Sequence, residues 1–162
     1  MKHYTQILIL VTVTLLGYSC AYSQETSKTE MEKLRFMIGD WVGTSSAIIN
    51  DTIAKQGPVF EKIAYKLDER LITIDLTSTT LQLHTVIYYD DKTKKYSYNP
   101  YYKSGNGTYS GEYKDGKFIV WFSATKRLIF QLTSDGNFKE YGETLVEGKW
   151  HKYFEDILSK SP

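Results

Sequence analysis

The stretch Gly39-Asp40-Trp41-Val42-Gly43-Thr44 determines how this chain is expected to fold. The segment before it, residues 31–38, carries apolar side chains at the three- and four-residue spacing of one helix face. Gly39 is expected to end this helix, because glycine tolerates the left-handed backbone conformation of helix stops. Residues 42–49 then alternate in the manner of a strand. The stretch therefore predicts a short helix that leads directly into a first strand.

Trp41 is expected to close one end of the core. Its indole ring is large and apolar and has a single polar N–H, which suits a buried plug with one hydrogen bond. Gly43 has no side chain and lets another backbone or a ring approach closely. We therefore interpret Gly39 and Trp41 as a structural plug rather than as ligand-binding residues.

The rest of the chain is typical of an all-β protein. Short strand-like runs are separated by turn signals about every ten residues, and the Asp-Gly pairs at 115–116 and 135–136 suit tight hairpins. Residues 154–158 are the one later run with a helical spacing. The expected strands are 41–50, 58–67, 70–78, 81–90, 95–102, 108–114, 117–124, 127–133, 138–144 and 148–155.

Short strands joined by tight hairpins favour one antiparallel up-and-down β-barrel of about eight to ten strands, with a short N-terminal helix. Closing the sheet removes its exposed edges, which an open meander would leave unpaired. A sandwich of two sheets is the alternative. Phe118 and Val120 share one strand face while Ile119 and Trp121 occupy the other. Apolar residues on both faces would fit an outer helix or a homodimer interface.

The Gly39-x-Trp41 motif after a short helix resembles the calycin superfamily of lipocalins, fatty-acid-binding proteins and nitrobindin-like barrels. The chain is most similar to uncharacterised secreted bacterial lipocalin-like proteins. The lipocalin resemblance implies that a basic side chain from a late strand packs over Trp41, and the candidates are Arg127, Lys149 and Lys152. The second lipocalin motif, Thr-Asp-Tyr, is missing from the chain.

The nitrobindin resemblance implies a haem held by a histidine near the C-terminus, for which His151 is the candidate. Residues 42–47 depart from the glycine-rich continuation of that family's motif. Fatty-acid-binding proteins use Arg-x-Tyr on their last strand, and the nearest match here is His151-x-Tyr153. The resemblance therefore covers the architecture, and we expect no cofactor or metal, with haem as the alternative.

The first residues have the pattern of a signal peptide. Lys2 is followed by an apolar run at 7–16, and Ala21 and Ser23 are small residues at the −3 and −1 positions of a cleavage site. We therefore expect a signal peptide at 1–23, a flexible leader at 24–30 and one barrel domain at 31–158. The protein would be exported to the periplasm or outside the cell. Anchoring as a lipoprotein through Cys20 is the alternative.

Charge and cysteine content exclude several classes of function. Lys2 is the one charged residue of the expected signal peptide, so 19 basic and 19 acidic residues remain. With no basic run or stripe, nucleic acid is not an expected partner. Cys20 is the only cysteine and lies in the removed segment, so disulfides, cysteine nucleophiles and thiolate metal sites are excluded. No arrangement of serine and histidine suggests a catalytic site.

A tyrosine cluster and one acid point to a binding site. Eight tyrosines fall within three consecutive expected strands, and such rings inside a barrel would line a pocket for an amphiphilic or planar ligand. Tyrosine is also a good strand former, so many of these rings would equally suit the outer surface. Glu61 shares a strand face with apolar residues. The predicted ligand contacts are Glu61, Tyr65, Tyr98, Tyr102 and Tyr109.

If Trp41 closes one end, the ligand enters at the other. The loops expected there are near 50–56, 79–80, 103–107 and 125–126, and Pro100 predicts a gap in strand pairing nearby. The sequence thus favours a secreted barrel that binds a small amphiphilic or apolar ligand. The alternatives are a haem-binding barrel, and a packed structural or partner-binding barrel without a ligand.

Overall fold

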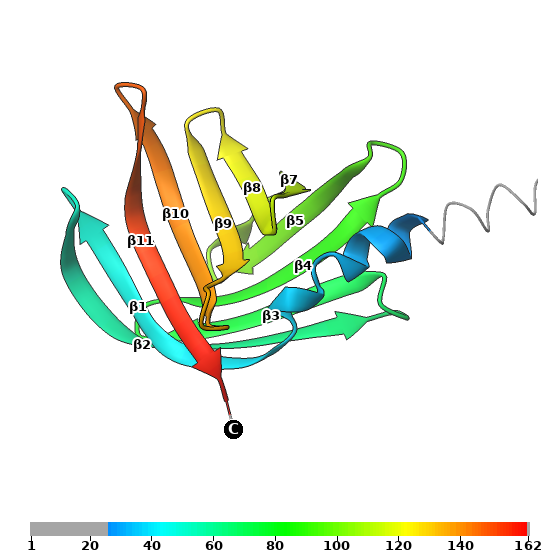
Figure 1. Cartoon of the computed structure of the whole chain (residues 1–162), viewed down its shortest axis with the longest axis horizontal. Helices are drawn as coiled ribbons and strands as arrows, with labels where there is room; N and C mark the ends of the chain where they lie inside the picture. Colours follow the sequence, from blue (N-terminus) through cyan, green and yellow to red (C-terminus); the bar gives the residue numbers. More distant parts are fainter. Residues whose placement is uncertain (1–25, 162) are drawn as a thin grey trace, which may run out of the picture.

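The computed structural model describes residues 26–161 and shows a closed antiparallel β-barrel (Figure 1). Apart from the two-residue β6, each strand pairs with the next along the chain, and β1 pairs with β11 to close the ring. β6 has only two residues and extends the pairing of β5, so ten strands form the wall. The strands are β1 (Gly39–Ile49), β2 (Thr52–Lys66), β3 (Leu71–Ser78), β4 (Gln82–Asp90), β5 (Lys95–Tyr102), β6 (Gly105–Asn106), β7 (Tyr109–Lys114), β8 (Lys117–Ser123), β9 (Lys126–Leu132), β10 (Phe138–Val146) and β11 (Lys149–Lys160).

The predicted fold class, an up-and-down barrel with a short N-terminal helix, is confirmed. The expected signal peptide at 1–23, including Cys20, lies outside the described residues. Pairing between β5 and β7 stops at Tyr98, and Pro100 follows with a carbonyl that accepts from Gly107 N–H at 3.1 Å. The gap in pairing expected near Pro100 is therefore present on that side of β5.

Two element boundaries were wrong. The loop expected near 50–56 is a two-residue turn, because Asn50 and Asp51 both adopt positive φ, which allows β2 to begin at Thr52. Residues 154–158 are strand and not helix. Pairing with β1 on one side and β10 on the other keeps β11 extended to Lys160 and overrides the local helical spacing.

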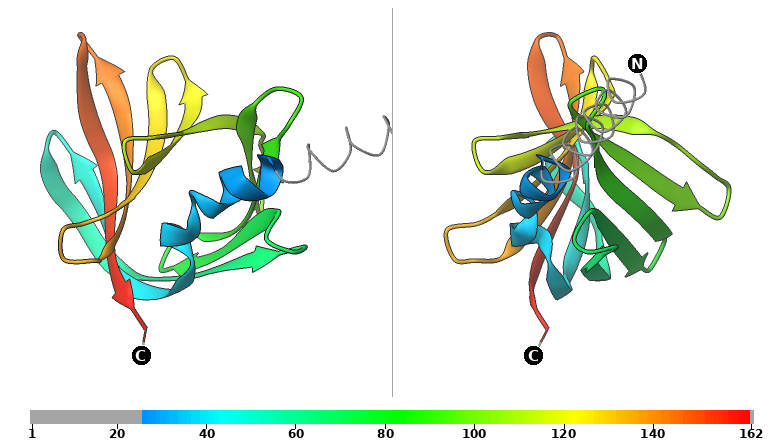
Figure 2. Two further views of the ribbon diagram at one scale, coloured as in Figure 1. Left: turned by 45° about the vertical axis from the view of Figure 1, so that its right-hand side comes forward. Right: turned by 90° about the vertical axis from the view of Figure 1, so that its right-hand side faces the viewer.

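The N-terminal segment covers one end of the barrel (Figure 2). Residues 26–32 are helical, and a 3₁₀ turn, η1 (Arg35–Met37), leads into β1. Met31, Leu34 and Met37 are fully buried against the core, so this segment acts as a lid of apolar side chains. Within residues 26–161, no helix is both long enough and apolar enough to cross a membrane.

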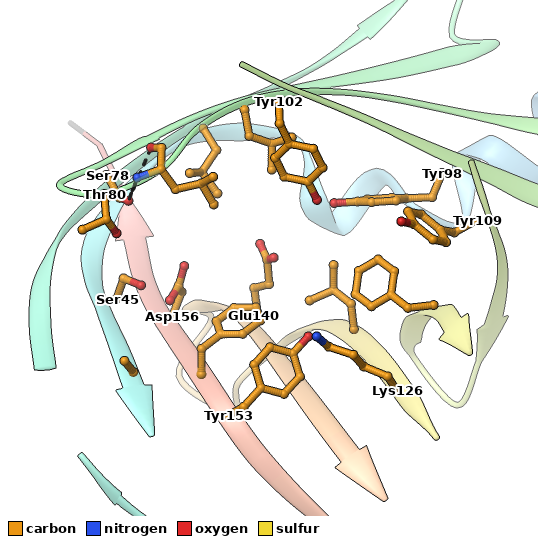
Figure 3. A pocket seen from close by; sticks show the side chains of 17 residues that line it. Ser45, Ser78, Thr80, Tyr98, Tyr102, Tyr109, Lys126, Glu140, Tyr153 and Asp156 are labelled. Atoms are coloured by element: carbon orange, nitrogen blue, oxygen red, sulfur yellow. Dashed lines mark hydrogen bonds between the residues drawn. The ribbon is translucent and has the colours of Figure 1, made fainter. Parts of the chain in front are cut away.

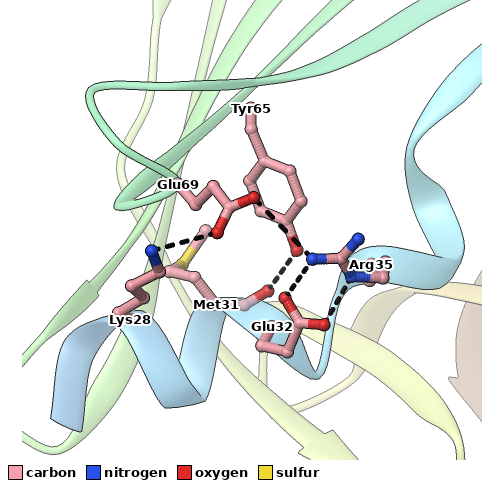
Figure 4. A network of polar contacts seen from close by, with 6 residues as sticks. All are labelled: Lys28, Met31, Glu32, Arg35, Tyr65 and Glu69. Carbon is pink, nitrogen blue, oxygen red and sulfur yellow. Dashed lines mark hydrogen bonds and ion pairs between the residues drawn. The ribbon is translucent and has the colours of Figure 1, made fainter. Parts of the chain in front are cut away.

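Polar contacts hold this lid to the barrel (Figure 4). The Tyr65 hydroxyl donates to the Met31 carbonyl oxygen at 3.1 Å. Glu69 lies 3.3 Å from the Lys28 ammonium and 3.7 Å from the Arg35 guanidinium. The described part of the leader expected at 24–30 is therefore helical and tethered, because Lys28 pairs with Glu69 and the Glu30 carbonyl oxygen accepts from the Tyr96 hydroxyl at 2.8 Å.

Trp41 is buried in the core and lies under the N-terminal lid, with 1% of its surface exposed. Its Nε1 donates to the Met37 carbonyl oxygen at 2.7 Å, and its ring stacks on Phe138 with centroids 5.1 Å apart. Stacking continues from Phe138 to Phe130 at 6.1 Å and from Phe130 to Phe118 at 5.7 Å. This row of four rings fills the half of the barrel next to the lid.

The basic residue over Trp41 is Lys160, whose ammonium lies 5.6 Å from the ring centroid. None of the three expected candidates occupies this position. Arg127 instead pairs with Glu143 at 2.7 Å and packs on Trp150 at 4.0 Å. The expectation failed because β11 is longer than the sequence suggested, and its register places Lys160 directly opposite Trp41.

Candidate functional site: a cavity in the open half of the barrel

The half of the barrel away from Trp41 contains a cavity of about 600 Å³ (Figure 3). Small-molecule sites usually enclose about 300–1,000 Å³ and combine apolar walls with a few polar groups. This cavity has that composition. Its lining consists of Ser45, Ala47, Leu76, Ser78, Thr80, Leu81, Leu83, Tyr98, Tyr102, Tyr109, Phe122, Lys126, Leu128, Glu140, Tyr153, Phe154 and Asp156.

The cavity opens at the end opposite the N-terminal lid. Thr80 and Leu81, in the turn between β3 and β4, are exposed, and so is Lys126 at the start of β9. The Lys126 ammonium lies 4.6 Å from the centroid of the Tyr153 ring at this rim. A ligand would therefore enter past the β3–β4 turn, which is one of the loops that the sequence places at the open end.

Tyrosine and phenylalanine rings form much of the wall. Tyr98 and Tyr102 point inward from β5, and Tyr109 from β7 packs edge-on against Phe122 at 4.7 Å (Figure 3). Burial raises the pKa of Tyr98 well above its ordinary value and raises that of Tyr153 to about 12. These hydroxyls therefore remain protonated at neutral pH and can donate hydrogen bonds to a ligand.

A β-bulge adds two further rings to the wall. The pairing of β10 with β11 shifts between Gly142 and Glu143, so Tyr153 and Phe154 both line the cavity although they are adjacent in sequence. Gly142 makes the space for them, because a Cβ there would lie 2.2 Å from the Tyr153 ring and 2.5 Å from the Phe154 ring. Regular alternation would have placed one of these rings outside, so the sequence did not indicate this pair.

The inner end of the cavity is acidic. Glu140 from β10 and Asp156 from β11 line it, and Glu61 from β2 lies behind them. Their exposed fractions are 6%, 4% and 0% respectively. The pairing brings them together, since Glu140 is directly opposite Asp156 across β10 and β11. Three carboxyl groups from three strands thus share one buried region.

Burial dominates the ionisation of these acids. It raises the pKa of Glu61 to about 8, with the Asp156 charge as the next cause. Burial also raises the pKa of Glu140 well above its ordinary value, and the charges of Glu61 and Asp156 add to this. For Asp156, burial raises the pKa to about 6 although a hydrogen bond with Ser45 opposes the shift. At neutral pH, Glu61 and Glu140 therefore retain protons, whereas Asp156 is mostly ionised.

Three oxygens of this acid cluster have no hydrogen-bond donor in the protein. Both oxygens of Glu61 and the Oδ1 of Asp156 are buried without a hydrogen-bond donor. Glu61 and Glu140 also affect each other, because their contact lowers the pKa of Glu61 and raises that of Glu140. The inner end of the cavity is therefore rich in carboxyl oxygens, and the Ser45 hydroxyl bonds to one of them, on Asp156.

The structure brings together three of the five residues predicted as ligand contacts: Tyr98, Tyr102 and Tyr109 line the cavity. Glu61 faces inward as expected but lies beneath the lining. Tyr65 lies at the opposite end of β2, where its hydroxyl binds the N-terminal lid, so it does not line the cavity.

Sequence reasoning missed Glu140 and Asp156. Glu140 alternates with Phe138 and Gly142, the same signal that identified Glu61, and could have been found in that way. Asp156 lies in the run expected to be helical, so its strand face was not considered.

His151, the candidate haem ligand, does not line the cavity. Its ring is exposed, and Nδ1 lies 3.5 Å from a carboxylate oxygen of Asp51 in the β1–β2 turn. The residues that line the cavity include no histidine, so they do not supply the histidine ligand through which the resemblance implied a haem.

No protein-family profile matches this sequence, and no curated protein matches it. Its structure is similar to solved structures that include the crystal structure of Rv2717c from M. tuberculosis. That match has a TM-score of 0.56 and 7% sequence identity, and it covers 82% of this chain and 98% of Rv2717c. At this identity the likeness shows the fold alone, which supports the barrel and leaves kinship with lipocalins a prediction from the sequence.

Proposed function

We propose that this protein binds a small amphiphilic or apolar ligand inside its barrel. The observation that carries the proposal is the cavity of about 600 Å³ with aromatic walls and a few polar groups at its inner end. A barrel whose only role is structural would be expected to fill its interior with side chains, as the half next to Trp41 does. We further propose, from the pattern of residues 1–23 alone, that the chain is exported.

Binding of the uncharged fluorescent probe N-phenyl-1-naphthylamine tests this proposal. The probe brightens in apolar surroundings, and we expect saturable binding with a Kd in the micromolar range, about −8 kcal/mol. Ala47→Trp is expected to weaken probe binding strongly, since Ala47 lines the cavity near its open end and a large ring there would narrow it.

Thr44→Trp is the matched control. Thr44 lies on the same strand but is exposed on the outer face, so this variant adds the same ring without filling the cavity. Equal probe binding in the two variants, or no saturable binding by the wild type, would contradict the proposal. Circular dichroism checks that both variants keep the strand content of the parent.

A further inference from the structure

The charges around the cavity are unbalanced along its length. Glu140 and Asp156 line the inner end, with Glu61 behind them. Lys126 is the only basic residue among those that line the cavity, and it lies at the exposed rim against the Tyr153 ring. A ligand that reaches the inner end therefore meets two carboxyl groups, with a third behind them, and no fixed positive charge.

This inner end has unsatisfied hydrogen-bonding capacity. The exposed fraction of Asp156 is 4%, and no hydrogen-bond donor contacts its Oδ1. Glu61 is fully buried, and neither of its carboxyl oxygens has a donor. A buried acceptor without a donor is costly, and a buried carboxylate is more so unless it is paired with a cation. Asp156 lines the cavity, so a ligand that carries donors and a positive charge would offset the deficit at this residue.

We propose that the ligand is a small cationic amphiphile whose protonated amine binds Glu140 and Asp156 while its apolar body lies along the tyrosine-lined wall. This inference rests on the proposed function and specifies the ligand's head group. An ammonium group has three N–H donors and one charge, which suits several carboxyl oxygens that converge from different strands. Tyr98 and Tyr102 beside it add rings that attract a cation.

An organic cation fits better than a metal ion. Among residues 26–161, no three histidine, cysteine, aspartate or glutamate side chains are placed to hold a metal. Most of the cavity's lining is aromatic or aliphatic, which gives an apolar body a binding surface beyond the charged group. The cavity therefore offers one acidic region and a larger apolar surface, which suits a molecule with one charged end.

Binding of the amine is expected to release protons. Burial raises the pKa of all three acids, so the free protein holds protons there at neutral pH, and an ammonium group would replace them. The other polar groups that face this region are neutral hydroxyls, apart from Lys126 at the rim. They are Ser45 from β1, Ser78 from β3, Thr80 from the β3–β4 turn, Tyr98 and Tyr102 from β5, Tyr109 from β7, Lys126 from β9 and Tyr153 from β11.

Competition against N-phenyl-1-naphthylamine tests the head group. The competitors decylamine, decanol and decanoate differ in their head groups and share a similar apolar chain. We expect decylamine to displace the probe roughly ten- to hundredfold more tightly than decanol, the usual range for a hydrogen bond to a charged group. Decanoate is expected to bind more weakly than decanol, because its charge repels the acids. Calorimetry in buffers of different ionisation enthalpy should show proton release with decylamine and none with decanol.

Variants identify the residues responsible. Glu140→Gln and Asp156→Asn keep the side-chain shapes, and each is expected to reduce the preference for decylamine over decanol to less than about a third of its wild-type value. Glu155→Gln removes the same charge from the residue next to Asp156 but on the outer face, where Glu155 pairs with Lys139 at 2.8 Å, and should keep the preference.

The outcomes separate this inference from the proposed function. If the probe binds in the cavity but decylamine is no tighter than decanol, the inference is wrong and the proposed function stands. If the probe does not bind at all, the proposed function is wrong, and the inference that rests on it is wrong as well. The comparison of head groups on the wild-type protein needs no variant, so a variant that fails to fold does not affect this conclusion.

Discussion

Trp41 combines three interactions that few residues could supply together. It is 1% exposed, donates to the Met37 carbonyl oxygen at 2.7 Å and stacks on Phe138. Lys160 covers its remaining face. One ring therefore connects the N-terminal lid, the aromatic core and the last strand, and its removal would leave a cavity bordered by all three.

Trp41→Ala is expected to lower the free energy of unfolding by about 3–5 kcal/mol, the usual cost of removing a fully buried aromatic ring. Urea denaturation followed by circular dichroism measures this. Trp150→Ala is the control, because it removes an equal ring from the partly exposed outer surface beside Arg127. A Trp41→Ala variant that loses no more stability than the control would show that Trp41 is not a plug.

At the scale of single elements, the close contact of β1 with β11 depends on one glycine. A Cβ on Gly43 would lie 2.0 Å from the carbonyl oxygen of Ile157 and 2.7 Å from the Cα of Leu158. Both atoms belong to the backbone, so neither can rotate away. The strand pairing that closes the barrel therefore requires glycine at this position.

Gly43→Ala is expected to cost about 2–3 kcal/mol of stability, since overpacking against a fixed backbone forces the strands apart. Gly57→Ala on β2 is the matched control, because its Cβ would meet only the Thr79 side chain, at 2.8 Å from Oγ1, which can rotate. Its expected cost is below about 1 kcal/mol. Equal unfolding free energies for the two variants would contradict this account of the pairing between β1 and β11.

The elements that the sequence predicted well are those with local signals. The sequence predicted the Asp-Gly turn after β7, because glycine adopts the positive φ that a tight hairpin requires. The structure confirms it, since Gly116 has φ +74°. The sequence did not predict the end of β11, since pairing with β1 and β10 keeps residues 154–158 extended. The bulge that turns Tyr153 and Phe154 to the same side likewise depends on the register of β10.

The same distinction applies to the site. Inward-facing tyrosines and Glu61 could be expected from alternation along one strand. The meeting of Glu61, Glu140 and Asp156 could not, because they lie on β2, β10 and β11 and approach one another only when the barrel closes. At the scale of the whole molecule, closure therefore builds a buried acid cluster that single strands do not reveal.

This cluster should make the whole protein's stability depend on pH in an unusual direction. Burial raises the pKa of Glu61 from 4.5 to about 8, so between these values the folded chain binds more protons than the unfolded chain. Stability therefore falls as pH rises through this window. Asp156, whose pKa rises from 3.8 to about 6, contributes in the same direction over a lower window.

The most direct test is the free energy of unfolding in urea at about pH 5.5 and about pH 8, for the wild type and Glu61→Gln. We expect the wild type to lose roughly 2 kcal/mol or more as pH rises, since each unit of pKa shift is about 1.4 kcal/mol. Glu61→Gln should lose less and be the more stable protein at the higher pH. The wild type and Glu61→Gln have the same exposed histidines. The difference between the two proteins in how the free energy of unfolding changes with pH therefore reports the buried acids. A wild type that is equally or more stable at the higher pH, with Glu61→Gln no better, would contradict a barrel built around unpaired buried carboxyl groups.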